Sequence, residues 1–215
     1  GQTNAAGTHD GLVLRYGSDG SLDDTFDADG KVTTDIDENT DFYVDVELQD
    51  DGKIVVVGSA WNSEGTQRSG LLTRYNTDGS LDTSFAAPDG FGLITDPDDY
   101  HYDVNSLKIQ DDGKIIAVLD VSDVLGVIDR FDANVSAYDT TFSAGADVVL
   151  WPMIGSAIQT DGSIVVSGYV SDLVVKVTRY TSTGEVDSNF ASAGTFSSPL
   201  EHYVATYSDA LIQND

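Results

Sequence analysis

Alternating and continuous apolar segments mark short β-strands along the chain. Residues 44–48 read Val-Asp-Val-Glu-Leu, with an apolar side chain at every second position, which is the pattern of a strand with one face in the core. The segments 54–57, 115–119 and 164–166 are apolar at consecutive positions and rich in β-branched residues, so they need cover on both faces. No segment has the spacing of a long amphipathic helix. The sequence therefore predicts an all-β fold.

Tight turns separate these strands. Asp50-Asp51-Gly52 follows the alternating segment, and the same Asp-Gly pair recurs at Asp112-Gly113 and Asp161-Gly162. Asp can close such a turn with its own side chain, and Gly adopts the positive φ that other residues resist. With further strands expected at Gly70–Tyr75 and Phe91–Thr95, these hairpins predict units of four antiparallel strands.

A longer pattern recurs four times. In each copy an Arg is followed by an aromatic residue, a turn, an Asp and a Phe, and the Arg-to-Phe step is eleven residues, or twelve in the third copy. The third copy also lacks the turn Gly, so its turn should be irregular. The copies are Arg15, Asp23 and Phe26; Arg74, Asp82 and Phe85; Arg130, Asp139 and Phe142; and Arg179, Asp187 and Phe190. Such recurrence indicates stacked structural units.

The spacing of these units favours one architecture. Four antiparallel strands that recur every 49 to 59 residues, with middle strands apolar on both faces, are typical of β-propeller blades, because neighbouring blades cover each other. A β-sandwich would also have short strands, but it does not account for the recurrence. The predicted fold is an all-β propeller of about four repeats in a single region, residues 1–215. The expected units are approximately 1–40 (partial), 41–99, 100–152, 153–200 and 201–215 (partial).

Two motifs carry a resemblance to a known family. LQDDGKIVVVG (48–58) and LLTRYNTDGSLDTSF (71–85) resemble the delta-60 repeat, a β-propeller-type repeat of unknown function in large secreted or surface bacterial proteins. The resemblance covers nearly the whole chain and departs in the turns of the third and fourth copies. It implies a repeat module of an exported protein, located outside the cell or on its surface.

The repeat frame also leads to expectations about the two ends. Gly1 aligns near Gly58, and residues 211–215 stop one residue before the position of the hairpin Gly. We expect a segment of a longer propeller or repeat array in preference to the alternative, a four-bladed ring whose last strand pairs with its N-terminal segment. An open end would expose unpaired backbone and apolar faces, so we expect a neighbouring repeat or chain to cover it.

The composition argues against two classes of partner. The chain has 37 Asp and Glu against 10 Lys and Arg, a net charge of −27, which disfavours binding to nucleic acid or to an anionic membrane surface. No apolar run is long enough to cross a bilayer, so membrane insertion is not expected. A hydrophobic content of 40% still predicts a packed core, and the absence of Cys excludes disulfides.

The recurring Arg and Asp residues are best interpreted as structural pairs. Arg presents a rigid donor fork that fits a carboxylate, and each Arg precedes the repeat Asp by eight or nine residues across a turn. The expected pairs are Arg15–Asp23, Arg74–Asp82, Arg130–Asp139 and Arg179–Asp187. We expect the four repeat Phe residues in the core between blades.

Clusters of Asp allow a calcium hypothesis, because hard cations take several carboxylate and carbonyl oxygens. The candidate ligands are Asp27, Asp29, Asp96, Asp98 and Asp99. In the first cluster, Lys31 stands where a third oxygen ligand should be. Calcium is the one cofactor that the sequence suggests, and otherwise none is expected.

Other candidate sites are isolated residues. Trp61 and Trp151 would suit stacking on sugar rings, although each occurs in only one unit. Asn134-Val135-Ser136 is the only N-glycosylation sequon. The three His residues have no metal-ligand spacing and no nucleophile motif nearby, so no catalytic site is predicted.

These observations favour a non-enzymatic structural or interaction module of an exported surface protein. We expect it to associate with other copies of itself or with neighbouring repeats, as a filament or adhesin subunit does. The alternative is a propeller domain that binds carbohydrate or peptide, with glycans as possible partners. An enzyme would need carboxylates and His residues from different blades to converge in one pocket.

Overall fold

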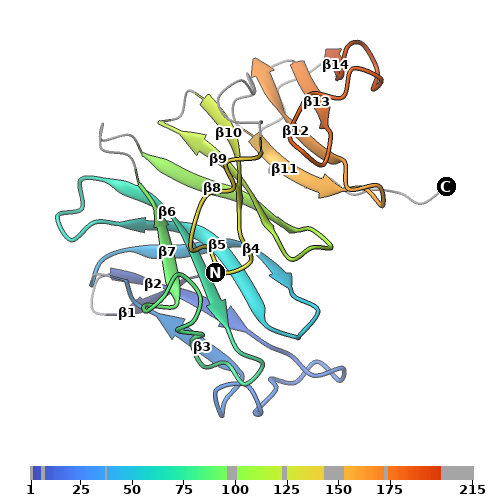
Figure 1. The fold of residues 1–215 in the computed structure, drawn as a ribbon. Helices are drawn as coiled ribbons and strands as arrows, with labels where there is room; N and C mark the ends of the chain where they lie inside the picture. Colours follow the sequence, from blue (N-terminus) through green and yellow to red (C-terminus); the bar gives the residue numbers. More distant parts are fainter. Residues whose placement is uncertain are drawn as a thin grey trace. The chain divides into compact units, whose positions relative to one another are not determined.

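The computed structural model describes residues 2–5, 8–36, 38–95, 101–122, 125–142, 153–171 and 174–199. Over these residues the chain forms β-strands, turns and loops without any helix (Figure 1). Accordingly, the described residues include no helix able to span a membrane. The strands form four antiparallel sheets of three or four strands, which confirms the predicted all-β fold and its blades of β-propeller type.

The first two sheets come from the first two repeats. The first sheet has the order β1-β2-β3, and the second has the order β4-β5-β6-β7, with antiparallel neighbours in both. Their strands are β1 (Gln2–Ala5), β2 (Thr8–Leu14), β3 (Lys31–Thr34), β4 (Asp41–Leu48), β5 (Ile54–Trp61), β6 (Arg68–Tyr75) and β7 (Phe91–Ile94). The expected strands at 70–75 and 91–95 therefore correspond to β6 and β7.

The other two sheets come from the third and fourth repeats. The third has the order β10-β9-β8 and the fourth β11-β12-β13-β14. Their strands are β8 (Tyr102–Ile109), β9 (Ile115–Val121), β10 (Leu125–Phe131), β11 (Met153–Ile158), β12 (Ile164–Ser171), β13 (Val174–Tyr180) and β14 (Thr195–Pro199). The continuous apolar segments at 115–119 and 164–166 lie in β9 and β12, which are inner strands of these sheets.

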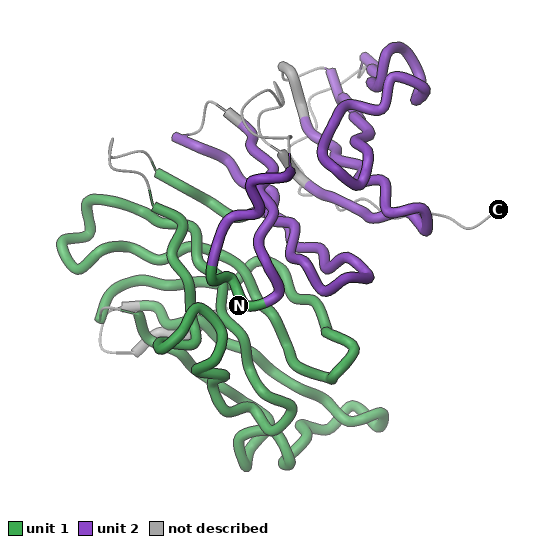
Figure 2. Tube along the Cα trace, in the orientation of Figure 1, with its two compact units in different colours: residues 1–104, 134–136 green, residues 105–133, 137–215 purple. Residues whose placement is uncertain are grey.

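The chain divides into two compact units (Figure 2). Unit 1 comprises residues 1–104 together with 134–136, and unit 2 comprises residues 105–133 and 137–215. The short segment 134–136 belongs to the turn of the third repeat, and its assignment to unit 1 reflects contacts with the second repeat that are described below.

The hairpin turns form as the sequence predicts. Between β4 and β5, Gln49 N–H donates to the carbonyl oxygen of Lys53, and Gly52 N–H donates to that of Gln49, both at 2.9 Å. Gly52 has a φ of 82°, and the Asp51 carboxylate accepts the N–H of Lys53 at 3.1 Å. The hairpins that follow β8 and β11 have the same backbone bonds. Asp therefore closes the turn and Gly supplies the left-handed backbone in each.

The turn of the third repeat is irregular, as its extra residue predicts. In the other three repeats, the N–H of the second residue after the Arg donates to the carbonyl oxygen four residues further on. In the third repeat, Asp132 N–H reaches the carbonyl oxygen of Ala137, five residues on, at 3.3 Å. Val135 takes a positive φ of 54° there, a conformation that β-branched residues rarely adopt.

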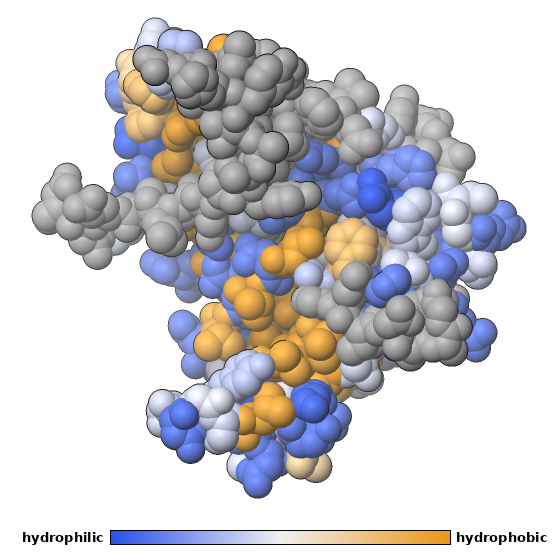
Figure 3. All heavy atoms as spheres, turned by 180° about the vertical axis from the view of Figure 1, so that it is seen from behind, coloured by the Kyte–Doolittle hydropathy of each residue, from blue (hydrophilic) through white to orange (hydrophobic). Residues whose placement is uncertain are grey.

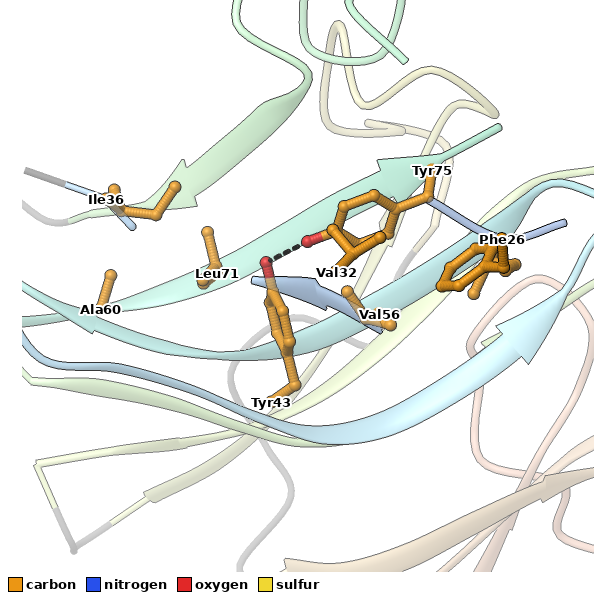
Figure 4. Close-up of a cluster of buried hydrophobic side chains, with 9 residues drawn as sticks. Phe26, Val32, Ile36, Tyr43, Val56, Ala60, Leu71 and Tyr75 are labelled. Carbon is orange, nitrogen blue, oxygen red and sulfur yellow. Dashed lines mark hydrogen bonds between the residues drawn. The ribbon is translucent and has the colours of Figure 1, made fainter. Parts of the chain in front are cut away.

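The core of unit 1 lies between the first and second sheets. Tyr43 of β4 and Tyr75 of β6 point their hydroxyl groups at each other across this core, 2.9 Å apart (Figure 4). Tyr43 also donates to Thr73 at 3.1 Å, and burial raises the pKa of both phenols, so both stay protonated. The surrounding buried apolar residues are Phe26, Val32, Ile36, Ile54, Val56, Ala60 and Leu71.

The core of unit 2 combines residues of the third and fourth sheets. Its buried members are Ile116, Val118, Ile128, Ile164, Val166 and Tyr180. Phe142 and Ile158 pack against them and are partly buried. In each unit, therefore, an apolar inner strand of one sheet is covered by the adjacent sheet, which is the packing that the continuous apolar segments require.

The structure corrects one expectation about β4. The strand forms where the alternation predicts it, but its apolar side chains lie at the surface. These exposed residues are Val44, Val46 and Leu48. The polar residues between them, Asp45 and Glu47, are partly buried. The reason is that cover comes from a neighbouring sheet, and the described part of the first sheet, β1-β2-β3, has no strand that aligns with β4.

A β-bulge interrupts the pairing of β4 with β5. The pairing of β4 with β5 shifts by one residue between Tyr43 and Asp45, opposite Gly58. A Cβ at Gly58 would lie 1.8 Å from the carbonyl oxygen of Phe42, so only Gly allows the two backbones to approach this closely. The fourth sheet has a comparable shift between Met153 and Gly155, where Gly168 lies opposite.

Candidate functional site

The most regular polar feature of the molecule is a cluster of one Arg, one Asp and one Phe in each repeat. In all four copies the Arg Nε lies 2.8 to 3.0 Å from Oδ2 of the repeat Asp. The guanidinium Cζ also lies over the ring of the repeat Phe, 4.6 to 4.9 Å from its centroid. We call this group the Arg–Asp–Phe cluster. Ion pair and cation–π contact together fix the plane of the guanidinium.

Local backbone bonds build each cluster. The Asp N–H donates to the carbonyl oxygen of the Arg, and the Phe N–H donates to that of the Asp, in all four repeats. The second carboxylate oxygen, Oδ1, accepts the N–H of the residue two positions after the Asp. That residue is Thr25, Ser84, Thr141 or Asn189. The short Asp-to-Phe step therefore turns the chain back and places the ring beneath the Arg.

The second cluster is the most deeply buried. The Arg74 and Asp82 side chains are 4% and 8% exposed, and Lys53 Nζ lies 2.8 Å from the same Asp82 oxygen as Arg74 Nε. Burial alone would raise the pKa of Asp82. Hydrogen bonds from Lys53 and Ser84, together with the charge of Arg74, outweigh burial and hold that pKa well below its usual range. Asp82 is therefore ionised in the folded protein.

The other clusters are ionised for related reasons. Hydrogen bonds from Thr141, from its backbone N–H and from Lys114 lower the pKa of Asp139, and the charge of Arg130 adds to them. The pKa of Asp23 is lowered first by Thr25. The pKa of Asp187 is lowered first by the backbone N–H of Asn189. Each carboxylate thus accepts hydrogen bonds from its Arg and from residues of its own turn.

The clusters also unite the two recurring sequence motifs. Arg74 Nη1 donates to Gln49 Oε1 at 3.3 Å, and Arg130 and Arg179 make the same bond to Gln110 and Gln159 at 3.2 and 3.4 Å. The Gln comes from the hairpin motif and the Arg from the turn motif. Sequence reasoning missed this role, although the recurrence of Gln before each Asp-Gly hairpin was a signal for it.

Each cluster donates hydrogen bonds to the turn of the next repeat where that turn is described. In unit 1, Arg15 Nη1 donates to the carbonyl oxygen of Thr77, and Asp27 N–H donates to that of Asp78 at 2.8 Å. In unit 2, Arg130 Nη1 donates to the carbonyl oxygen of Ser182 at 2.7 Å. We call this contact the repeat joint. Its donors are the side chain of the Arg and the backbone N–H of the residue after the Phe. Its acceptors are the carbonyl oxygens of the third and fourth residues after the Arg of the next repeat.

The joint survives in altered form at the irregular third turn. Arg74 Nη2 donates to Asn134 Oδ1 at 3.0 Å, and Ala86 N–H donates to the Asn134 carbonyl oxygen at 2.7 Å. Asn134 is the sequon residue, and its side-chain amide is engaged in this joint. These contacts explain why residues 134–136 belong to unit 1.

The proposed calcium ligands are not gathered into a site in the part of the chain that the structure describes. Asp29 Oδ1 accepts the N–H of Lys31 at 3.0 Å, and Asp27 has a positive φ of 49° in the repeat joint. Across the described ranges, no three acidic or His side chains come together in a way that could hold a metal ion. Asp96, Asp98 and Asp99 lie outside the described residues.

The first tryptophan candidate lies at the end of β5, where its ring is shared with other side chains. The guanidinium Cζ of Arg68 lies 5.5 Å from the Trp61 ring centroid, and the His101 ring centroid lies 6.1 Å away. His101 Nδ1 accepts the backbone N–H of Arg68 at 3.1 Å, and Arg68 also pairs with Asp103. Trp151, the other candidate, lies outside the described residues.

Comparison with known protein families gives a match over parts of the chain. The family of a domain of unknown function, DUF5122, described as a β-propeller, matches residues 1–26, 49–85 and 159–190. Each matched segment ends at a repeat Phe, and the third repeat, with its irregular turn, is not among them. No curated protein gives a significant match. Together with the four antiparallel sheets, this similarity identifies the chain as a β-propeller repeat domain.

Proposed function

We propose that this chain is a non-enzymatic structural and interaction module of an exported surface protein, and that it associates with further copies of itself. The observation that carries the proposal is an apolar surface on unit 1, at positions that are buried elsewhere in the chain. Figure 3 displays apolar residues gathered at the surface over this unit. This surface consists of exposed apolar residues of β2, of β4 and of the turn after β2: Leu14, Tyr16, Val44, Val46 and Leu48.

Alignment of the repeats supports this interpretation. Val46 is 54% exposed. The residues that align with it in the third and fourth sheets are both fully buried; they are Leu107 and Ser156. Leu14 is 40% exposed, whereas the aligned Thr73 of the second sheet is fully buried. Apolar side chains at positions that a neighbouring sheet normally covers mark an interaction surface. Another sheet of the same kind is the natural occupant of such a surface.

The polar residues support a structural role. The recurring Arg, Asp, Gln and Lys side chains bind one another and the adjacent turns, as described above, and those contacts hold the repeats together. Each such contact engages a charged side chain within the fold. A repeat whose most regular polar residues serve its own joints suits assembly from like units.

The charge and the resemblance to exported repeats support the location. A net charge of −27 keeps the exposed faces solvated, and it makes copies of the chain repel each other at low ionic strength. Association through the apolar surface should therefore strengthen as salt screens this repulsion. The delta-60-like motifs are of a kind found in large secreted and surface proteins, and they support placement outside the cell.

Sedimentation velocity over a range of protein concentrations tests this function. We expect concentration-dependent association that increases with salt. Val46→Asp should weaken it about tenfold or more, because a carboxylate would have to be buried. Leu93→Asp, on the edge strand β7, is the matched control and should have little effect. A wild-type chain that stays monomeric at every concentration and salt level would overturn the proposal.

A further inference from the structure

The repeat joint shows which surfaces of this chain are complementary. Within unit 1, the donors of the first repeat meet the acceptors of the second at Thr77 and Asp78. The contact buries the groups beneath it: Phe26 is 0% exposed, and a Cβ at Gly79 would lie 2.9 Å from the backbone nitrogen of Asp27. The joint is therefore a packed contact with defined donors and acceptors.

The fourth repeat presents the donor half of this joint. Arg179 pairs with Asp187 and Gln159, and among the described residues neither Nη1 of Arg179 nor the N–H of Ala191 donates to a following turn. Ala191 already has a φ of 44°, close to the 49° of Asp27 in the formed joint. The φ of the donor residue Ala191 thus matches that of its counterpart in the formed joint.

Apolar cover is also missing beside these donors. Phe196 of β14 is 51% exposed, whereas Val32, the aligned residue of the first sheet, is 7% exposed. Phe190 is partly buried, whereas Phe26 and Phe85 are fully buried. The fourth repeat therefore has the exposed side chains expected of a blade without a described neighbour on this face.

The first repeat presents the acceptor half. Ser18 and Asp19 stand at the third and fourth positions after Arg15, and within the described ranges their carbonyl oxygens accept no hydrogen bond. Their turn has the same closing bond as the bound turn of the second repeat: Gly17 N–H to the Ser21 carbonyl oxygen at 2.8 Å. A Cβ at Gly20 would meet nothing within 4 Å, whereas the aligned Gly79 is packed.

We propose that the Arg179 and Ala191 donors of one chain bind the Ser18 and Asp19 carbonyl oxygens of a second copy, which forms a repeat joint between chains. The occupant is a second copy because its turn has the backbone conformation that these donors already bind within the chain. The charges also match, since Asp78, the counterpart of Asp19, lies in the field of Arg15. This inference rests on the proposed function and names its contact.

The contact is heterologous, because different surfaces of the two copies meet. Each added copy presents a fresh acceptor turn at one end and a fresh donor cluster at the other. The expected product is a head-to-tail series of copies. It differs from a symmetric dimer, which would stop at two.

Disulfide trapping tests the joint directly, since the natural chain has no Cys. Asp19→Cys and Ala191→Cys are prepared as separate variants, one of them carrying a tag, and are mixed under mild oxidation. We expect a tagged-to-untagged disulfide dimer, at least about tenfold more abundant than with Glu64→Cys in place of Ala191→Cys. Glu64 lies in the exposed loop between β5 and β6 and serves as the matched control.

Two further variants make the trapping result decisive. Asp27→Cys with Asp78→Cys in one chain copies the observed joint and should form an intrachain disulfide, which shows that the geometry permits the bond. Asp19→Cys with Ala191→Cys in one chain should give a ladder of covalent oligomers. Absence of the mixed dimer, or an intrachain disulfide alone in the last variant, overturns the proposal. The latter result would assign the contact to the two ends of one chain.

Sedimentation separates this proposal from the proposed function. Arg179→Ala should weaken association about tenfold, whereas Lys176→Ala, which removes the same charge from the same strand, should change it less than about twofold. Arg179→Lys keeps the ion pair with Asp187 but loses the fork, so it should also weaken association. Strong association with no effect of either Arg179 variant would leave self-association standing and overturn this joint. A monomeric wild-type chain would overturn both.

Discussion

The ring of Tyr43 in the second sheet packs directly against the backbone of Gly11 in the first. A Cβ at position 11 would lie 2.5 Å from Cε2 and 2.7 Å from Cζ of that ring. Tyr43 cannot move aside easily, because it is 7% exposed and its hydroxyl is bound to Thr73 and Tyr75. The first and second sheets can approach only because residue 11 has no side chain.

Gly11→Ala should therefore destabilise unit 1. We expect a loss of about 1–3 kcal/mol, the usual range for overpacking a core, measured by urea unfolding. Tyr43→Leu removes the ring, so Gly11→Ala should cost much less in that background, and a double-mutant cycle gives the difference. Equal costs in both backgrounds would show that the two residues do not constrain each other.

The hydroxyl group of Tyr43 should contribute to stability in its own right. Tyr43→Phe leaves Thr73 and Tyr75 each without one partner in the core, and we expect a loss of about 1 kcal/mol. Tyr16→Phe removes the same group from a side chain that is 57% exposed and should be neutral in the same unfolding assay. A neutral Tyr43→Phe would indicate that the remaining hydroxyl groups satisfy one another.

The four Arg–Asp pairs should differ in strength according to their burial. Asp82→Ala leaves Arg74 and Lys53 without their shared carboxylate, at a site where the Arg74 side chain is 4% exposed, so we expect a loss of about 3 kcal/mol. Asp23→Ala removes the aligned residue of a pair whose side chains are 30% and 27% exposed, and the loss should be clearly smaller. Calorimetry of both variants checks this order, which equal losses would contradict.

Asp129 of β10 should make stability depend on pH in the mildly acidic range. Burial raises its pKa to about 6 from an ordinary value of 3.8. Because the folded state holds the proton more tightly, this residue's contribution favours folding below about pH 4 and declines as the pH rises to about 6. Asp129→Asn should remove this dependence and stabilise the protein at neutral pH by about 1–3 kcal/mol. Unfolding midpoints between pH 4 and 8 test this, and parallel pH profiles of the two proteins would contradict it.

The sequence was sufficient to predict the strands, the hairpins and the irregular third turn, because local rules govern them. The apolar face of β4 shows where such rules stop. The alternation at 44–48 identifies a strand, but burial depends on which sheet lies opposite. Val46 is exposed and its counterpart Leu107 is buried, although both are apolar residues at the same repeat position. Period-2 patterning alone does not determine which of two like positions is covered.

In the candidate site, too, some contacts could be predicted from the sequence and others could not. The spacing of Arg and Asp predicted their pairing, since both residues lie in one turn. The repeat joint could not be predicted, because Arg15 and Thr77 are 62 residues apart and the acceptor is a carbonyl oxygen, a group that every residue has. The stacking of Arg on Phe was also missed, although the constant eleven-residue step between them was its signal.

The use of main-chain oxygens as acceptors has a consequence for how such chains can change. Thr77 and Ser182 receive the same bond, and the chemistry of their side chains does not enter into it. The side chains at these positions can therefore change in evolution without loss of the hydrogen bond that joins successive repeats. A protein engineer could shuffle, duplicate or delete modules that are joined through main-chain oxygens and keep those junctions, provided that the turn retains its shape.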